Sequence, residues 1–89
     1  MLEQDIEIIN KLGLHARAAA KLVKLASSFD STIEIEKDGQ RVNAKSIMGV
    51  MMLAASCGIT VRACVDGSDE QQAMDALVQL FEDRFGEDE

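Results

Sequence analysis

The pattern of apolar and polar residues predicts four short strands. Residues 5–9, DIEII, partly alternate, and residues 32–36, TIEIE, alternate strictly, as expected for a strand with one buried face. The Asp-Gly pair at 38–39 predicts a type I′ turn, because both central positions of that turn need a positive φ. Residues 41–44 then return as the next strand, and residues 59–65 supply the fourth.

Three segments with helical spacing lie between and after these strands. Residues 16–28 are rich in strong helix formers. A second helix is expected to begin after Ser46 as its N-cap and to end near Gly58. A capping box at 68–71 starts the third helix, which Gly86 stops. The resulting order, β-α-β-β-α-β-α, favours an α+β fold in which helices cover one face of an antiparallel sheet.

Length and charge narrow the functional classes. The chain has 89 residues, so we expect a single domain, 1–89, with a modest core. Its net charge of −7 argues against a general affinity for nucleic acid or anionic membranes. No apolar run approaches a membrane-spanning length, and the amino terminus lacks the cationic start of a signal peptide, so we expect a cytoplasmic protein.

No metal or organic cofactor is expected. Cys57 and Cys64 lack the spacing of metal ligands, and a lone histidine cannot complete a zinc site with them. Both cysteines are interpreted as reduced packing residues.

Acidic residues concentrate at the carboxyl end. Residues 1–65 carry a net charge of +1, whereas residues 66–89 carry −8. This segment is either a solubilising tail or a mask for a locally basic face elsewhere, and both interpretations can hold.

The only histidine, His15, lies where a glycine-containing loop enters the first predicted helix. Free backbone N–H groups of Ala16, Arg17 and Ala18 in the first turn, together with the helix dipole, favour an anion there. The guanidinium of Arg17 adds cationic donors suited to phosphate oxygens. These features indicate a place where an imidazole nitrogen accepts a phosphoryl group. The alternative is a histidine that serves only as a cap or surface residue.

The segment 47–55, IMGVMMLAA, contains no polar side chain. A helix that is apolar all round is either buried on every side or faces a partner. We assign Val50 and Leu53 to the core. Some of the remaining large side chains are then expected to stay exposed as an interaction surface: Ile47, Met48, Met51 and Met52. The alternative is a core helix in which methionine fills gaps.

Three segments, INKLGLHARAAAKLV, AKSIMGVMMLAA and ALVQLFEDRF, resemble the HPr family of phosphocarrier proteins, and the similarity covers nearly the whole chain. The NKLG entry, the methionine-rich second helix and the RFGEDE ending are most similar to its nitrogen-type branch, NPr. The resemblance implies an HPr-like open-faced β-sandwich, with a four-stranded antiparallel sheet and three helices on one face.

The resemblance also implies roles for individual residues. His15 would take a phosphoryl group at Nδ1 from enzyme I, which draws it from phosphoenolpyruvate, and pass it to a histidine of an EIIA-type protein. Arg17 would contact the phosphoryl oxygens. Ser46 falls on the regulatory serine that HPr kinase/phosphorylase modifies in bacteria that have this enzyme, although a plain N-cap needs no such function. The positions that would dock partners are Ala20, Val23, Lys24, Ile47, Met48 and Met51.

One residue departs from the family pattern. The family usually has proline where this chain has Ala18. Alanine keeps the helix and adds one N–H donor near the predicted phosphoryl site.

The sequence therefore predicts a monomeric, stoichiometric phosphoryl carrier of the nitrogen-related regulatory branch rather than a free-standing enzyme. The first rival is a sugar-type HPr controlled at Ser46. The second is a regulatory binding module that phosphorylation switches and that need not pass the group on. An acid–base enzyme using His15 alone has little support, because no second titratable group is positioned beside it.

Overall fold

The four predicted strands and three predicted helices all form, in the predicted order. The computed structural model describes residues 1–87 and adds a short 3-10 helix, η1, near the end of the chain. The elements are β1 (Leu2–Glu7), α1 (Ala16–Ser27), β2 (Thr32–Lys37), β3 (Gln40–Asn43), α2 (Ile47–Met52), β4 (Thr60–Asp66), α3 (Glu70–Glu82) and η1 (Arg84–Gly86).

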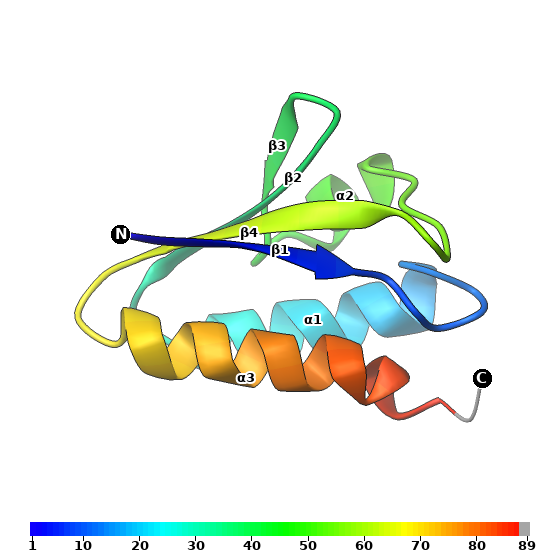
Figure 1. The fold of residues 1–89 in the computed structure, drawn as a ribbon. Coiled ribbons are helices and arrows are strands. Elements are labelled where there is room, and N and C mark those ends of the chain that lie inside the picture. Colours follow the sequence, from blue (N-terminus) through cyan, green and yellow to red (C-terminus); the bar gives the residue numbers. More distant parts are fainter. Residues whose placement is uncertain (88–89) are drawn as a thin grey trace.

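The strands form one antiparallel sheet in the order β1-β4-β2-β3 (Figure 1). β1 pairs with β4 from Leu2, opposite Val65, to Glu7, opposite Thr60. This pairing explains why β1 occupies residues 2–7 instead of the predicted 5–9. The hairpin prediction is confirmed, because Asp38 and Gly39 both have a positive φ, of 51° and 83°.

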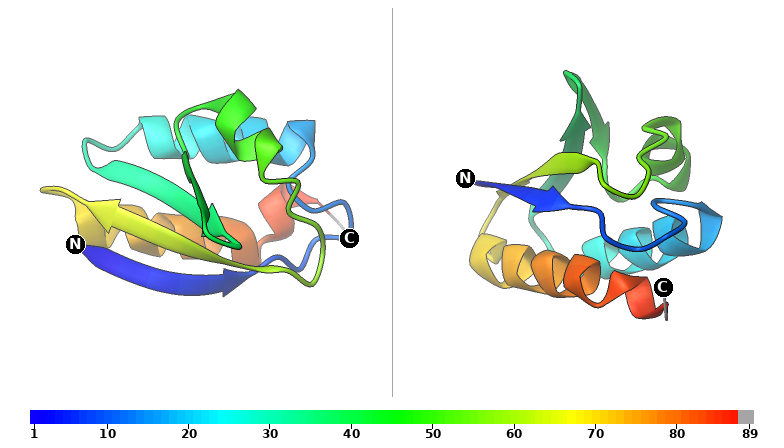
Figure 2. Two further views of the ribbon diagram at one scale, coloured as in Figure 1. Left: turned by 90° about the horizontal axis from the view of Figure 1, so that it is seen from above. Right: turned by 45° about the vertical axis from the view of Figure 1, so that its right-hand side comes forward.

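Helices α1 and α3 lie side by side across one face of the sheet, and α2 stands beside the first part of α1 (Figures 1 and 2). This arrangement confirms the predicted four-stranded sheet with three helices. The alternating apolar residues of the strands meet the apolar stripes of the helices in one core. Its largest fully buried side chains include Phe81, Phe85, Ile8, Leu22, Ile33, Ile35 and Leu77.

Helix α2 is shorter than predicted. It begins after Ser46 as expected, but its last residue is Met52 and its C-cap is Leu53, so the prediction that it extends to Gly58 was wrong. Ala54 has a positive φ of 51°, which turns the chain out of the helix. The carbonyl of Ala55 then accepts the N–H of Leu14, 2.9 Å away, so this segment pairs with another loop instead of continuing the helix.

Helix α3 does not begin with the predicted capping box at 68–71. Its N-cap is Asp69, whose carboxylate makes no cap bond within the helix. The carboxylate instead accepts the N–H groups of Asp30 and Ser31, each at 2.9 Å, and the hydroxyl of Ser31. A tertiary contact to the segment before β2 therefore replaces the local cap.

Helix α3 also ends before Gly86, the residue predicted to stop it. Its last residue is Glu82, and Arg84 and Phe85 then each have a φ of 55°. This backbone turn still buries the ring of Phe85, whose centroid lies 4.9 Å from that of Phe81. Phe85 therefore joins the core from η1 instead of from α3.

Replacing Asp69 by Asn is expected to lower stability at neutral pH and to weaken its dependence on pH in acid. The Ser31 hydroxyl, then the amide of Asp30, hold the pKa of Asp69 below its ordinary value. Because folding favours the ionised carboxylate, its stabilisation is complete above the unfolded pKa of about 3.9 and is lost as pH falls through the lower folded value. Urea unfolding of both proteins from about pH 7 to about pH 3 measures this. Ser31→Ala should reproduce part of the loss, and identical pH profiles for wild type and Asp69→Asn would contradict the assignment.

Candidate functional site

Two loops hold the entry to α1 in place. Ile8 bonds to two successive residues at the end of the loop after α2, donating to the carbonyl of Ile59 at 2.9 Å and accepting from the N–H of Gly58 at 2.8 Å. Leu14 donates to Ala55 one step before His15. Gly13 has a φ of 63° and packs directly against the backbone of residues 55–56. These contacts fix the position of the backbone at His15, where the loop enters α1.

His15 is the N-cap of α1, with an extended backbone and no side-chain cap bond to the helix. The first helical bond runs from the N–H of Ala19 to the carbonyl of His15, at 2.8 Å. The N–H groups of Ala16, Arg17 and Ala18 therefore have no acceptor within the helix and lie at its positive end. The side chain of His15 is 26% exposed, so a reactant can reach it.

Arg17 lies in the first turn of α1 and is exposed. Within residues 1–87 its guanidinium makes no hydrogen bond or ion pair. A guanidinium that residues 1–87 leave without a partner can bind an anion beside the helix start.

Sequence reasoning missed two residues that contact the histidine site. Nε2 of His15 is bonded to the carboxylate of Glu87. The side-chain amide of Asn10, which is fully buried, donates to the carbonyl of Gly13 at 2.8 Å and to the other oxygen of Glu87 at 3.0 Å. The hydrogen bond from Asn10, followed by that from His15, lowers the pKa of Glu87.

The segment that follows α3, residues 84–87, is anchored over this site. Lys21 donates from Nζ to the carbonyl of Phe85 at 2.5 Å, and the N–H of Glu87 bonds to the carbonyl of Arg84 at 2.9 Å. Glu87, which follows η1, the red turn in Figure 1, thereby contacts both Asn10 and His15. The acidic tail thus reaches the site itself, an arrangement that neither interpretation of its charge foresaw. Two features of the sequence could have indicated this contact: the concentration of acidic residues after residue 65, and the polar Asn10 directly after an apolar strand.

Ser46 is the N-cap of α2, as predicted. Its hydroxyl accepts the N–H of Gly49 at 3.1 Å. This bond gives the serine a structural role in the short helix, and its side chain remains half-buried.

The predicted apolar surface is present on α2. Val50 and Leu53 are buried, as assigned, whereas the other large side chains are exposed: Ile47, Met48, Met51 and Met52. Met48 is the most open of them, with 75% of its surface accessible. Among the positions predicted to dock partners from α1, Ala20 and Lys24 are exposed and Val23 is half-buried. Leu12, 65% exposed in the loop before His15, extends the apolar character and was missed.

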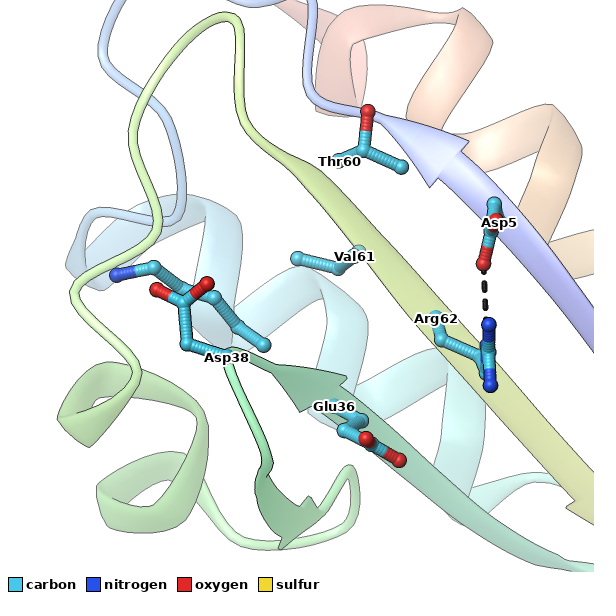
Figure 3. Close-up of a pocket in the computed structure, with 7 residues that line it drawn as sticks. Asp5, Glu36, Asp38, Thr60, Val61 and Arg62 are labelled. Atoms are coloured by element: carbon cyan, nitrogen blue, oxygen red, sulfur yellow. Dashed lines mark hydrogen bonds and ion pairs between the residues drawn. The ribbon is translucent and has the colours of Figure 1, made fainter.

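A shallow concave region lies on the outer face of the sheet. Figure 3 shows it between β1, β4 and β2, where Arg62 donates to Asp5 at 3.2 Å. None of the predicted site residues lines it.

Within residues 1–87, no group of three or more acidic, cysteine or histidine side chains is placed to hold a metal ion. Cys64 is buried but Cys57 is exposed, so the interpretation of Cys57 as a packing residue was wrong. In the described part of the chain, none of the helices has the length and apolar character needed to cross a bilayer.

Comparison with known proteins gives one consistent result. The family model described as "PTS HPr component phosphorylation site" matches residues 2–83. The phosphocarrier protein HPr of Cupriavidus necator is 61% identical over 89 residues, covering 100% of both chains, and that of Xylella fastidiosa is 58% identical over 88 residues, covering 99% of each. The crystal structure of HPr-C-His from Thermoanaerobacter tengcongensis superposes with a TM-score of 0.96 and 54% identity, covering 100% of both chains.

Proposed function

Because this chain belongs to the HPr family and is a phosphocarrier of the phosphotransferase system, we propose that His15 is the residue that carries the phosphoryl group, on Nδ1. One observation supports this most directly. His15 is an accessible N-cap beside three helical N–H groups without helical acceptors, and Nε2 is already bonded to Glu87. Nδ1 is then the ring nitrogen left to attack phosphorus.

The groups around His15 suit phosphoryl transfer. The N–H groups of Ala16, Arg17 and Ala18 and the guanidinium of Arg17 stabilise negative charge on the transferred oxygens. In the step itself, the Nδ1–P bond forms while the P–N bond to the donor histidine breaks. The bonding electron pair stays on the donor imidazole, so no other reactant is consumed. The open site needs a docked partner to exclude water.

The partners follow from the family, whose members exchange phosphoryl groups with enzyme I and EIIA-type proteins. We assign the donor role to enzyme I and the acceptor role to an EIIA-type protein of the nitrogen-related branch, in the cytoplasm, with the chain acting as a monomer. The docking surface comprises the predicted positions on α1 and α2: Ala20, Val23, Lys24, Ile47, Met48 and Met51. The NKLG entry and the acidic ending favour the nitrogen branch, while the relatives named plainly HPr keep the sugar branch as the second candidate.

Intact-mass spectrometry tests the carrier role. After incubation with enzyme I, phosphoenolpyruvate and Mg²⁺, the protein should gain a single acid-labile phosphoryl adduct. Adding EIIA proteins of the nitrogen and sugar branches separately then shows which one removes the adduct fastest. An absence of any adduct with cognate enzyme I would contradict the carrier role, and faster discharge by a sugar-type EIIA would contradict only the branch.

Ser46→Asp is expected to reduce kcat/KM for transfer from enzyme I about tenfold, mainly through KM, because a charge at an interface acts on association. The fold should survive, since the helix dipole tolerates a negative charge at an N-cap. The new charge would lie beside Ile47 and Met48, within the proposed docking surface. The same reasoning applies to phosphorylation by an HPr kinase/phosphorylase in a host that has one.

Ser46→Ala is the matched control. It removes the bond to Gly49 without adding charge, and its cost of about 1 kcal/mol falls on stability instead of transfer. Wild-type transfer kinetics in Ser46→Asp would count against a docking surface at this helix.

A further inference from the structure

We propose that Glu87 is a positioning residue for His15: its side-chain carboxylate selects the ring tautomer that leaves Nδ1 free and compensates the ring charge that forms on phosphorylation. This inference rests on the proposed function of His15. It concerns a residue outside the segment matched by the family model, which ends at residue 83.

Glu87 is held in place by contacts at both of its carboxylate oxygens. One carboxylate oxygen accepts from Asn10 at 3.0 Å while the other contacts Nε2 of His15. Asn10 cannot move away, because it is fully buried and its amide also bonds to the carbonyl of Gly13. The side chain of Glu87 is itself only 14% exposed. The carboxylate therefore bridges the loop before α1 and the imidazole in a defined geometry.

The carboxylate of Glu87 determines which imidazole nitrogen of His15 carries the proton. An ionised carboxylate only accepts hydrogen bonds, so the nitrogen that faces it must carry a hydrogen. The bond to Asn10 lowers the pKa of Glu87 and so keeps it ionised. In the neutral ring, a hydrogen on Nε2 leaves the lone pair on Nδ1. Glu87 thus selects which nitrogen is the nucleophile.

The imidazole of His15 gains positive charge during phosphoryl transfer. As the Nδ1–P bond forms and the donor P–N bond breaks, the ring keeps its Nε2 hydrogen and becomes a phosphoimidazolium cation. The donor imidazole leaves with the bonding pair. The carboxylate of Glu87 then faces the new positive charge, and its charge-assisted bond to Nε2 strengthens as the charge develops. Passing the group on reverses each of these changes.

If Glu87 served only to hold the segment after α3 in place, truncating its side chain would lower the stability of the fold. The segment before Glu87 is already held in place by the buried Phe85 and by the bond from Lys21 to its carbonyl. Truncating the side chain of Glu87 should therefore leave the fold intact. The consequences should fall on the ring of His15 and on the transfer step.

The test uses the full chain with Glu87→Gln and Glu87→Ala, and with Asp75→Ala as the matched control. Asp75 is an exposed carboxylate within α3, so the control removes the same charge away from the site. Nitrogen-15 NMR of the imidazole reports which ring nitrogen is protonated, and assignment is unambiguous because the chain has one histidine. Transfer from phosphorylated enzyme I is measured in parallel as kcat and KM.

In wild type and Asp75→Ala, the neutral ring should carry its hydrogen on Nε2. In both Glu87 variants the two tautomers should mix, since glutamine can also donate to Nε2. The kcat for transfer should fall about tenfold, as expected for losing a charge-assisted hydrogen bond, with KM unchanged because the apolar docking surface is untouched. Wild-type tautomer and wild-type kcat in Glu87→Ala would overturn the proposal. If wild-type protein accepts no phosphoryl group, the carrier function fails, whereas the tautomer measurement still decides the role of Glu87.

Discussion

His15→Ala is expected to abolish the phosphoryl adduct and to reduce transfer to background, while the fold persists. The imidazole is partly exposed and makes no cap bond to α1, so its removal leaves the core intact. The carbonyl of residue 15 still accepts the first helical bond from Ala19. What disappears is the nucleophile, for which Arg17 and the helical N–H groups offer no substitute.

Two controls make this result specific to the histidine. Ser46→Ala should keep the acid-labile adduct, because Ser46 lies at a different helix from His15. A phosphoserine, by contrast, would be stable to acid. His15→Ala should also inhibit transfer to the wild-type protein competitively, since its exposed apolar residues on α2 are unchanged. An adduct that survives in His15→Ala would place the acceptor elsewhere in the chain.

The elements that could be predicted are those governed by local patterns. Strict alternation in residues 32–36 corresponds to β2, and the Asp-Gly pair at 38–39 forms the expected turn. The helix beginning at Ala16 and the N-cap at Ser46 were also predictable, because both depend on neighbouring residues. The exposure of the methionines on α2 followed from the inability of a single helical layer to bury a helix on all sides.

The features that escaped prediction depend on contacts between distant segments. The carboxylate of Asp69 makes no cap bond in its own helix because it bonds to residues 30–31. Helix α2 ends early because Ala55 pairs with the loop before His15. Glu87 reaches His15 across 72 positions of sequence. No hydrophobic period or capping rule encodes such pairings, because both describe only neighbouring residues.

Gly13→Ala is expected to have the largest effect on stability, a loss of about 3 kcal/mol. The φ of Gly13 is 63°, which costs an alanine about 1–2 kcal/mol. A Cβ there would lie 2.6 Å from the carbonyl oxygen of Ala55 and 2.7 Å from Cα of Ser56. Both are backbone atoms, so the two loops must move apart. Relieving that overlap adds about 1–3 kcal/mol.

Gly39→Ala separates these two costs. Its φ of 83° is equally unfavourable for alanine, but a Cβ there meets nothing within 4 Å. Gly39→Ala should therefore lower the free energy of unfolding only by the conformational cost, about 1–2 kcal/mol. Urea unfolding of both variants gives the difference, and equal losses would show that the loops absorb the Cβ without strain. Gly13→Ala should also slow phosphoryl transfer where Gly39→Ala does not, because the bond from Asn10 to the Gly13 carbonyl and that from Leu14 to Ala55 both position His15.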